Sequence, residues 1–233
     1  GVVLIKTKSG KAQKTTLNFE SYYSLNQLPK KMDLMNAYEF AKTINEQLED
    51  VGQAPSFSST VLDSLKNHST DWQDAIYRNA WTQNYMLSLN GGSERFNYYI
   101  SGGFNDIDGI LINTNEKRTS LRTKFNAKIG EKLQMSLNLY GTQRNGTNNA
   151  YTGRDIEPAG QALLSDPMMP IYKPDGTFNL NSQYGSTWTQ PYSRALLSNL
   201  NNNQNLYNGN LSIDYEIVDN LFLTVQTVLE ESY

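Results

Sequence analysis

The sequence predicts an all-β chain that forms part of a transmembrane antiparallel β-barrel, and three observations lead to this fold class. Residues 83–140 contain four successive runs, each near the roughly 9–11 residues with which a tilted strand crosses a bilayer. Apolar and polar side chains alternate along these runs with a period of two. Tight turns at 91–94 and 130–131 alternate with a longer polar connection at 106–118, as in membrane barrels. The four runs span 83–91, 95–105, 119–129 and 132–140.

The alternation divides the strands into an apolar face and a polar face. In a membrane barrel the apolar face meets lipid and the polar face lines the lumen. The residues expected to face lipid are Leu121, Phe125, Ile129, Leu133, Leu137, Leu211 and Ile213. The residues expected to face the lumen are Arg122, Lys124, Asn126, Lys128, Asn138 and Asp214. Cations in the lumen either steer an anionic solute or only line water, and the sequence leaves both interpretations open.

Three further runs extend the expected sheet to seven strands. They span 15–25, 207–217 and 220–230. From residue 15 onward, long connections at 26–82, 106–118 and 141–205 alternate with tight turns, so all three long connections leave the sheet at one end. Seven strands cannot close a wide barrel, and the open edges require further chain to pair with them. We therefore expect the chain to be a piece of a longer protein.

The long connections carry local signals of their own. Apolar spacing near 3.6 residues predicts a helix over 35–47, with Asn36 as its N-cap. A second short helix is expected over 59–66. The stretch 199–205 is nearly all Asn and Gln, and it is interpreted as a solvated loop.

The composition excludes several classes of protein. No stretch approaches the roughly 20 consecutive apolar residues of a membrane helix, which excludes a helical membrane protein. The formal charge of −3 arises from mixed charges without a basic patch, so nucleic acid is not an expected partner. The absence of Cys excludes a disulfide scaffold. The 15 Tyr and 8 Phe suit strands with two different faces better than one large sealed core.

No constellation of residues supports an enzyme, a metal site or a cofactor. His68 is the only His and there is no Cys, so neither a catalytic triad nor a His-rich metal site can be assembled, and an exposed loop His is expected. Asp106, Asp108 and Gly109 begin a Ca²⁺-loop pattern, but the acidic ligand that should follow is missing. A polar loop turn is therefore the expected structure there.

Aromatic residues fall into two groups. Those near strand ends fit a girdle at the membrane interface. In the longest connections, Trp188 and Tyr192 are candidates for contact with substrate, because aromatic faces stack on sugar rings. Packing inside the loop or against a lid protein is the competing interpretation. The expected girdle residues are Tyr85, Tyr98, Phe104, Tyr140, Tyr207 and Phe222.

Several stretches resemble the SusC/RagA-type TonB-dependent outer-membrane transporters. Residues 1–11 (GVVLIKTKSGK) are similar to the end of that family's plug domain. Residues 70–78 (TDWQDAIYR) and the motifs within 83–104 are similar to its early barrel strands, and the likeness continues at 109–110 and 118–122. It is dense up to about residue 142, compositional in the connection that follows, and weaker in the last two strands.

The resemblance implies a barrel of about 22 strands that holds a plug in its lumen. It implies import of oligosaccharides or peptides together with a SusD-like surface lipoprotein, driven by TonB through a segment absent from this chain. Residues 1–14 would be the end of the plug and a linker, and 15–233 the first part of the barrel in the outer-membrane lipid. The long connections would be extracellular and the tight turns periplasmic, in a Bacteroidota-type cell.

Residues 2–8 are too few to span a membrane, so we expect them to pair with other plug strands and not with the wall at 15–25. A soluble β-rich binding module or adhesin is the alternative function, because alternation and aromatic loops would look similar in it. Dependence on detergent distinguishes the two. The strand motifs do not separate glycan importers from peptide importers.

Overall fold

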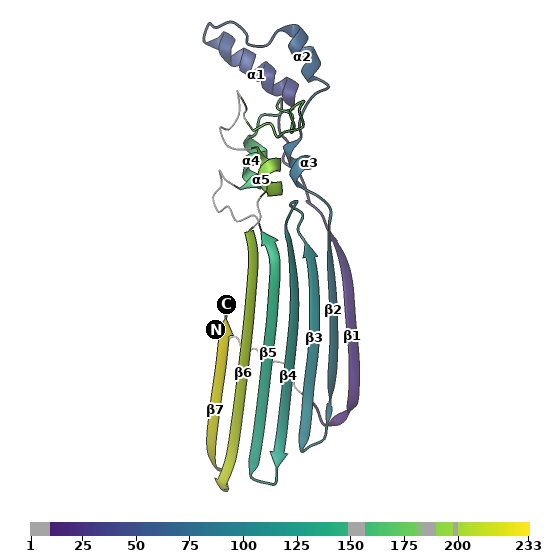
Figure 1. The fold of residues 1–233 in the computed structure, drawn as a ribbon, viewed down its shortest axis with the longest axis vertical. Helices are drawn as coiled ribbons and strands as arrows, with labels where there is room; N and C mark the ends of the chain where they lie inside the picture. Colours follow the sequence, from purple (N-terminus) through teal and green to yellow (C-terminus); the bar gives the residue numbers. More distant parts are fainter. Residues whose placement is uncertain (1–9, 149–156, 181, 183–189, 198–199) are drawn as a thin grey trace.

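The computed structural model describes residues 10–148, 157–180, 182, 190–197 and 200–233. Within these residues, seven strands form one antiparallel sheet in which each strand pairs with the next along the chain (Figure 1). The strands are β1 (Gln13–Asn26), β2 (Ala80–Gly92), β3 (Phe96–Asp108), β4 (Asn115–Ile129), β5 (Leu133–Asn148), β6 (Leu200–Val218) and β7 (Leu221–Ser232). β1 and β7 are the two edges, and the sheet is not closed. The expected fold class, an antiparallel fragment of a β-barrel, is confirmed.

Expected strand boundaries are wrong at one end of the sheet, where the strands run further than the alternation indicated. β3 continues to Asp108 and β4 begins at Asn115, so the long connection expected at 106–118 is only 109–114. The loop expected at 199–205 is strand instead, because Asn201 and Asn203 pair with Thr147 and Asn145 of β5. Side chains there are polar on both faces, which removes the alternation by which a strand is recognised.

The register of the ladders separates the predicted faces as expected. Arg122 lies opposite Ser101 and Tyr140, whereas its neighbour Leu121 lies opposite Gly102 and Gly141. We call the side of the sheet that carries Arg122 the polar face and the side that carries Leu121 the apolar face. All seven residues expected to face lipid lie on the apolar face, and all six expected to face the lumen lie on the polar face.

The tight turns gather at one end of the sheet and the helices at the other (Figure 1). Gly130 and Asn220 sit in two of the turns with φ of 66° and 64°, a backbone region that glycine and asparagine tolerate best. At the opposite end, five short helices lie in the two long connections of the described chain. They are α1 (Ala37–Asp50), α2 (Ser59–Leu65), α3 (Trp72–Ile76), α4 (Pro158–Leu164) and α5 (Pro191–Leu197).

The expected N-cap of the first helix is confirmed. Asn36 Oδ1 accepts a hydrogen bond of 3.0 Å from the Glu39 N–H, and Glu39 Oε2 accepts one of 3.0 Å from the Asn36 N–H. This reciprocal pair satisfies two donors that the first turn of a helix otherwise leaves free. The second helix also forms where the sequence indicated, and begins after a Ser58 cap.

Almost no side chain of the sheet is buried, and the compact core lies among the loops instead. Trp72 and Ile76 of α3 pack with Ala162 of α4, Met169 and Ala195 of α5. None of the described helices has the length and apolar character that crossing a membrane requires. The short strand expected at 2–8 lies outside the described residues.

Candidate functional site

The lower half of the polar face, toward the tight turns, is joined by hydrogen bonds between side chains of adjacent strands. Asn126 Nδ2 donates to Asn97 Oδ1 over 2.7 Å, and Ser136 Oγ donates to Asn126 Oδ1 over 3.0 Å. On β6, Asp214 accepts a bond of 2.6 Å from the Thr224 hydroxyl. These hydroxyl and amide groups form a wettable lining, and Lys124, Lys128 and Asp214 add charges of both signs to it.

Basic residues dominate the upper half of the same face. The Arg122 guanidinium lies over the Tyr140 ring, 5.0 Å from its centroid. Arg144 forms an ion pair with Glu116. Arg118 lies directly opposite Arg144 in the ladder. Neither Arg118 nor Arg144 was expected on this face, because the predicted strands 119–129 and 132–140 stop short of them.

The six residues expected to line the lumen share a face but do not form one compact site. Lys124 lies opposite Asn138, and Lys128 lies opposite Gln134, which in turn lies opposite Asp214. They therefore spread over three strands along the height of the sheet. This spacing fits the wall of a wide passage better than a single binding pocket.

The chain that precedes β1 reaches the sheet on its polar face. The Lys11 N–H donates to Asn90 Oδ1 over 3.1 Å, and Asn90 lies in the same cross-strand row as Tyr99 and Lys124. Gly10 passes so close to β3 that an added Cβ would lie 2.4 Å from the Tyr98 nitrogen. The backbone before the first strand thus runs on the side of Lys124, near the tight turns.

Three connections far apart in the sequence lock together above the sheet, and we call this assembly of α3, α4, α5 and residues 166–172 the loop platform. Trp72 is 3% exposed, and its indole N–H donates to the Asp166 carbonyl over 2.9 Å. The Thr70 hydroxyl donates to the Met169 carbonyl over 2.8 Å. The Ile112 N–H donates to the Ile76 carbonyl over 2.9 Å, so the turn after β3 joins the platform as well.

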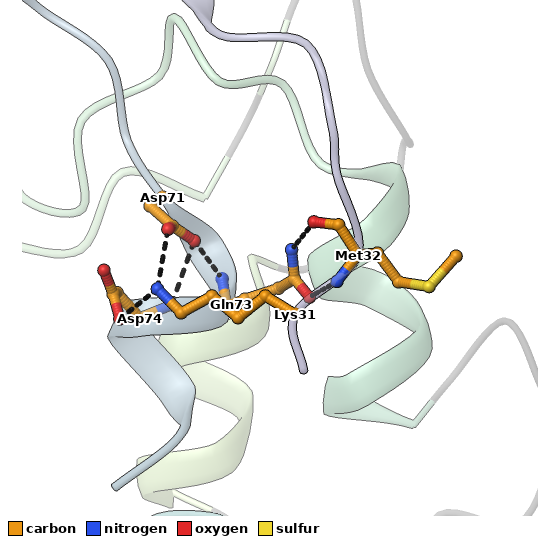
Figure 2. Close-up of polar contacts among 5 residues, drawn as sticks. All are labelled: Lys31, Met32, Asp71, Gln73 and Asp74. Atoms are coloured by element: carbon orange, nitrogen blue, oxygen red, sulfur yellow. Dashed lines mark hydrogen bonds and ion pairs between the residues drawn. The ribbon is translucent and has the colours of Figure 1, made fainter. Parts of the chain in front are cut away.

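A side-chain clasp attaches the segment that leads into α1 to the loop platform (Figure 2). Gln73 Nε2 donates to the Met32 carbonyl over 2.8 Å, and Gln73 Oε1 accepts from the Met32 N–H over 2.9 Å. Beside it, Lys31 Nζ lies 3.0 Å from Asp71 Oδ2 and also pairs with Asp74. Gln73 is 5% exposed whereas the charged side chains are largely exposed, so the buried amide contributes more than the ion pairs.

Two of the charges in the clasp are tuned by their neighbours. Hydrogen bonds to Asp74 and then Asp71 raise the pKa of Lys31. Partial burial opposes ionisation of Asp71, but the Asp74 backbone N–H and the Lys31 ammonium outweigh it and lower the pKa of Asp71. Asp71 also caps α3, accepting bonds of 2.9 and 3.0 Å from the N–H groups of Gln73 and Asp74. Both groups therefore stay charged at neutral pH.

A groove of about 400 Å³ runs beside this clasp. Its walls come from residues 32–36, α3 and α4, and they include Met32, Trp72 and Leu163. Leu34 and Met35 at its border are 44% and 52% exposed. The loop end thus presents apolar side chains next to polar backbone, a composition common at protein contact surfaces.

Tyr192, a predicted substrate contact, belongs to an aromatic cluster on the loop platform. Its ring lies 6.2 Å from that of Tyr172 and 6.3 Å from that of Phe178, and the latter two stack at 5.2 Å. Tyr192 also packs against the core around Trp72, as the competing interpretation of loop packing proposed. Trp188, the other candidate, lies outside the described residues.

Some expectations about single residues are corrected. Asp106 and Asp108 are not in a polar turn but in β3, where Asp106 pairs with Lys117 at 3.3 Å and Asp108 with Arg78 at 3.7 Å. His68 does lie exposed in a connection. Among the described residues, no three His, Asp or Glu side chains gather closely enough to hold a metal ion.

The predicted aromatic girdle is only partly compatible with the register. Tyr140 and Phe222 lie on the polar face, opposite Arg122 and Glu216, so they cannot belong to a lipid-facing girdle. An aromatic near a strand end indicates an interface position only when its parity matches the apolar face. Tyr85, Tyr98, Phe104 and Tyr207 have that parity.

Comparison with known proteins agrees with this architecture, although no protein-family model matches the sequence. The chain is 31% identical over 226 residues to the TonB-dependent receptor P3 of Formosa agariphila, and 28% identical over 238 residues to the TonB-dependent receptor SusC of Bacteroides thetaiotaomicron. These alignments cover 95% and 93% of the chain but only 21% and 22% of the relatives. The chain thus spans about a fifth of their length.

Among solved structures, the RagAB peptide importer in its "closed-closed" state superposes with a TM-score of 0.73 at 22% identity. That superposition covers 97% of this chain and 29% of the importer chain, and it shows a shared fold. The relatives are named as receptors and importers and not as enzymes. The chain is a segment of a SusC/RagA-type TonB-dependent transporter, a β-barrel protein of the outer membrane.

Proposed function

We propose that the whole protein imports oligosaccharides or peptides across the outer membrane, together with a SusD-like surface lipoprotein and driven by TonB through a segment absent from this chain. The observation that carries the proposal is the two-faced meander of seven strands, whose helical connections emerge at one end and tight turns at the other. A barrel transporter needs an apolar outer surface, a polar inner surface and loops that shape its entrance. The apolar face, the polar face and the loop platform are the counterparts in this chain.

The polar face is proposed as the wall of the lumen and the apolar face as the lipid contact. Exposed Leu17 and Phe19 on the apolar face are 68% and 62% accessible, which would be unfavourable in water over so large a surface. The approach of Lys11 to Asn90 on the polar face supports this assignment, because the plug of a TonB-dependent barrel precedes the first strand and lies inside. Residues 1–14 are accordingly proposed as the end of the plug and its linker, and 15–233 as the first part of the barrel.

The loop platform is proposed to be extracellular and the tight turns periplasmic. On this topology the groove beside Met32 and the cluster around Tyr192 lie at the mouth, where a lipoprotein lid and the entering solute would contact them. Trp188 and Tyr192 remain the proposed aromatic contacts to solute. RagAB is named a peptide importer, whereas the name of SusC states no cargo, so the choice between glycan and peptide rests on the uptake experiment.

Uptake by cells tests the proposal. Cells that produce the full-length protein and its lipoprotein would be supplied with fluorescent mixtures of short oligosaccharides or of short peptides, with TonB present or deleted. We expect one class to accumulate inside only when TonB and the lipoprotein are both present. Binding at the cell surface without accumulation would indicate an adhesin and contradict import.

Labelling of introduced cysteines tests the topology separately, since this segment contains no Cys of its own. In intact cells, a membrane-impermeant maleimide should label Thr177→Cys in the hairpin before α5 and should not label Asp219→Cys in the turn between β6 and β7. Disruption of the outer membrane should then expose the second site. Labelling of Asp219→Cys alone would reverse the proposed orientation.

A further inference from the structure

We propose that the upper polar face holds an oxyanion site formed by Arg118 and Arg122 and bordered by Arg144, which binds a carboxylate or sulfate group of the transported solute. The proposal rests on the proposed function, since it assigns a substrate chemistry to the same lumen wall. It selects the steering interpretation of the lumen cations over the interpretation that they only line water.

The site has a floor of small side chains. Ser120 on β4 lies opposite Gly103 on β3 and Thr142 on β5, so three small residues follow one another across the sheet. An added Cβ at Gly103 would lie 2.9 Å from the Ser120 hydroxyl, which shows how closely this row is packed. Because these three side chains are small, they leave a shallow depression on the polar face that larger side chains would fill.

Three guanidinium groups border this floor. Arg118 and Arg144 lie in the next row toward the loops, and Arg122 lies in the next row toward the tight turns, beside Tyr140. Rows on one face are about 7 Å apart, and an Arg side chain extends about that far, so the Arg118 and Arg122 head groups can meet at one anion above Ser120, while Arg144 stands beside Arg118. A guanidinium presents its N–H groups as a planar fork that matches a carboxylate or sulfate.

Only one of these three cations has a carboxylate partner among the described residues. The polar faces of the flanking strands β3 and β5 carry no Asp or Glu along their whole length. Glu116 pairs with Arg144, which leaves two of the three positive charges without an acidic partner among the described residues. The next acid in the Arg122 row is Glu230 on β7, three strands away and hence about 14 Å distant.

The placement of Arg118 and Arg144 is unfavourable for the sheet by itself. Like charges directly opposite each other across two strands repel, and either position would be more stable with a neutral residue. The Arg118 guanidinium has no hydrogen-bond or ion-pair partner in the described part of the chain, and Arg122 Nε is buried without one. Unmet donors and repelling charges in one place are typical of a site that is completed by a ligand.

Arg122 is held in position by the Tyr140 ring, which its guanidinium covers at 5.0 Å from the centroid. Stacking fixes the plane of the fork while its edge stays available for hydrogen bonds. Arg144 is fixed by Glu116 and by a 3.4 Å bond to Gln204 Oε1. Arg118 is the exposed member and would close on the anion from above.

The described part of the chain before β1 does not reach the site. The preceding chain meets the polar face at Asn90, in the row of Tyr99, whereas Arg118 lies in the row of Asn105. Six residues along a strand separate these rows, about 20 Å. The site therefore lies in the upper part of the proposed lumen, which a solute entering from the loop end would reach first.

Arginine modification in the full-length detergent-solubilised transporter tests the site without depending on uptake. Phenylglyoxal would be applied alone or with one of four probes, and modification of Arg118, Arg122 and Arg144 read by peptide mass mapping. The probes are trigalacturonate and its neutral counterpart galactotriose, and triglutamate and its neutral counterpart triglutamine. We expect rapid modification without probe and at least fivefold slower modification with an anionic probe, whereas the neutral probes should give no protection.

Three variants on one strand sharpen the test. Arg118→Gln should weaken binding of the protective anionic probe about tenfold by calorimetry, and Arg118→Lys should weaken it less, because it keeps the charge but loses the fork. Lys117→Gln, the matched control, removes a cation at the same height on the apolar face and should leave binding unchanged. Binding that Lys117→Gln reduces equally would reflect general charge and contradict the site.

The remaining outcomes are also decisive. Protection by trigalacturonate alone would identify an acidic glycan, and protection by triglutamate alone an acidic peptide. Equal protection by charged and neutral probes would overturn the proposal, and so would no protection at all. If the exposed Arg118 is unreactive before any probe is added, another part of the protein occupies the site, and the proposal is overturned. A transporter that imports solute yet shows no anion protection would refute the site and leave the proposed function intact.

Discussion

The sheet and the loop platform are stabilised in opposite ways. Every residue of β7 and nearly every residue of β1 is exposed, whereas Trp72 and Ile76 of α3 are almost completely buried in the loop platform. The platform therefore has its own core, but the sheet has only its ladders. On the proposed topology, lipid would cover its apolar face and further strands would pair with its edges. The difference teaches that one chain can combine a sheet that lacks a buried core with a loop platform that is packed around a core, as a soluble domain is.

The largest expected effect breaks the platform and spares the wall. Trp72→Ala removes a side chain that is 3% exposed and its bond to the Asp166 carbonyl, and should destabilise the platform by about 3–5 kcal/mol. Limited proteolysis of the full-length transporter should then cut within 157–180, while the barrel keeps its heat-resistant migration. Trp81→Ala is the control, because Trp81 is 53% exposed and its removal should change little.

The next effect separates the two faces of one strand. Leu137→Arg should cost about 2–4 kcal/mol if Leu137 lies near the bilayer midplane. Its neighbour Asn138 points to the polar face, so Asn138→Arg should cost far less. Urea titration of the full-length transporter folded into phospholipid vesicles measures both. Equal losses, or a greater loss for Asn138→Arg, would contradict the assignment of faces.

Loss of the clasp should loosen the α1–α2 segment without unfolding the platform. Gln73→Ala leaves the Met32 N–H and carbonyl without their buried partner, at a cost of about 1–3 kcal/mol. Hydrogen exchange should rise in residues 32–50 and stay unchanged around Trp72. Gln53→Ala, an exposed residue after α1, is the control. Faster exchange throughout the platform would show that the clasp is not a local attachment.

The smallest expected effect is the pH dependence of the same attachment. Asp71 has a lowered pKa, so its contribution is present above the ordinary value of 3.8 and is lost as pH falls through the folded value. Lys31 has a raised pKa, so its contribution is present below the ordinary value of 10.5 and is lost as pH rises through the folded value. Intrinsic-rate-corrected exchange in residues 32–50 should thus stay constant between about pH 5 and 9. Lys31→Met should lower the free energy of opening of residues 32–50 by less than about 1 kcal/mol. A pronounced change near pH 7 would show that some other group controls the attachment.

The sequence predicts the sheet well wherever one face is apolar and the other polar. Leu133, Leu137 and Leu211 alternate with Gln134, Asn138 and Asn210, and the ladders preserve this parity. Prediction fails in the Asn-rich start of β6, where both faces are polar and only the ladder to β5 makes a strand. Strand pairing also decides on which face an aromatic side chain lies. It places Tyr140 on the polar face, against the Arg122 guanidinium, and not in the girdle.

The candidate sites were less predictable than the sheet. Gln73 has no signal in the sequence, because its partner is the backbone of Met32, forty-one residues earlier. Arg118 and Arg144 become neighbours only through the register of β4 and β5 beyond the expected strand ends. Contacts between residues far apart, such as Trp72 with Asp166, define the platform, and no local pattern of residues encodes them.

The most direct test of the account asks which solvent each face of β4 meets. Spin labels would be attached to cysteines introduced one at a time at 119–126 in the full-length transporter in lipid vesicles, and collision with oxygen and with a water-soluble nickel complex measured. Labels at Leu121, Thr123 and Phe125 should collide with oxygen, and labels at Arg122, Lys124 and Asn126 with the nickel complex. The opposite phase, or no alternation along the strand, would contradict a polar lumen wall backed by lipid.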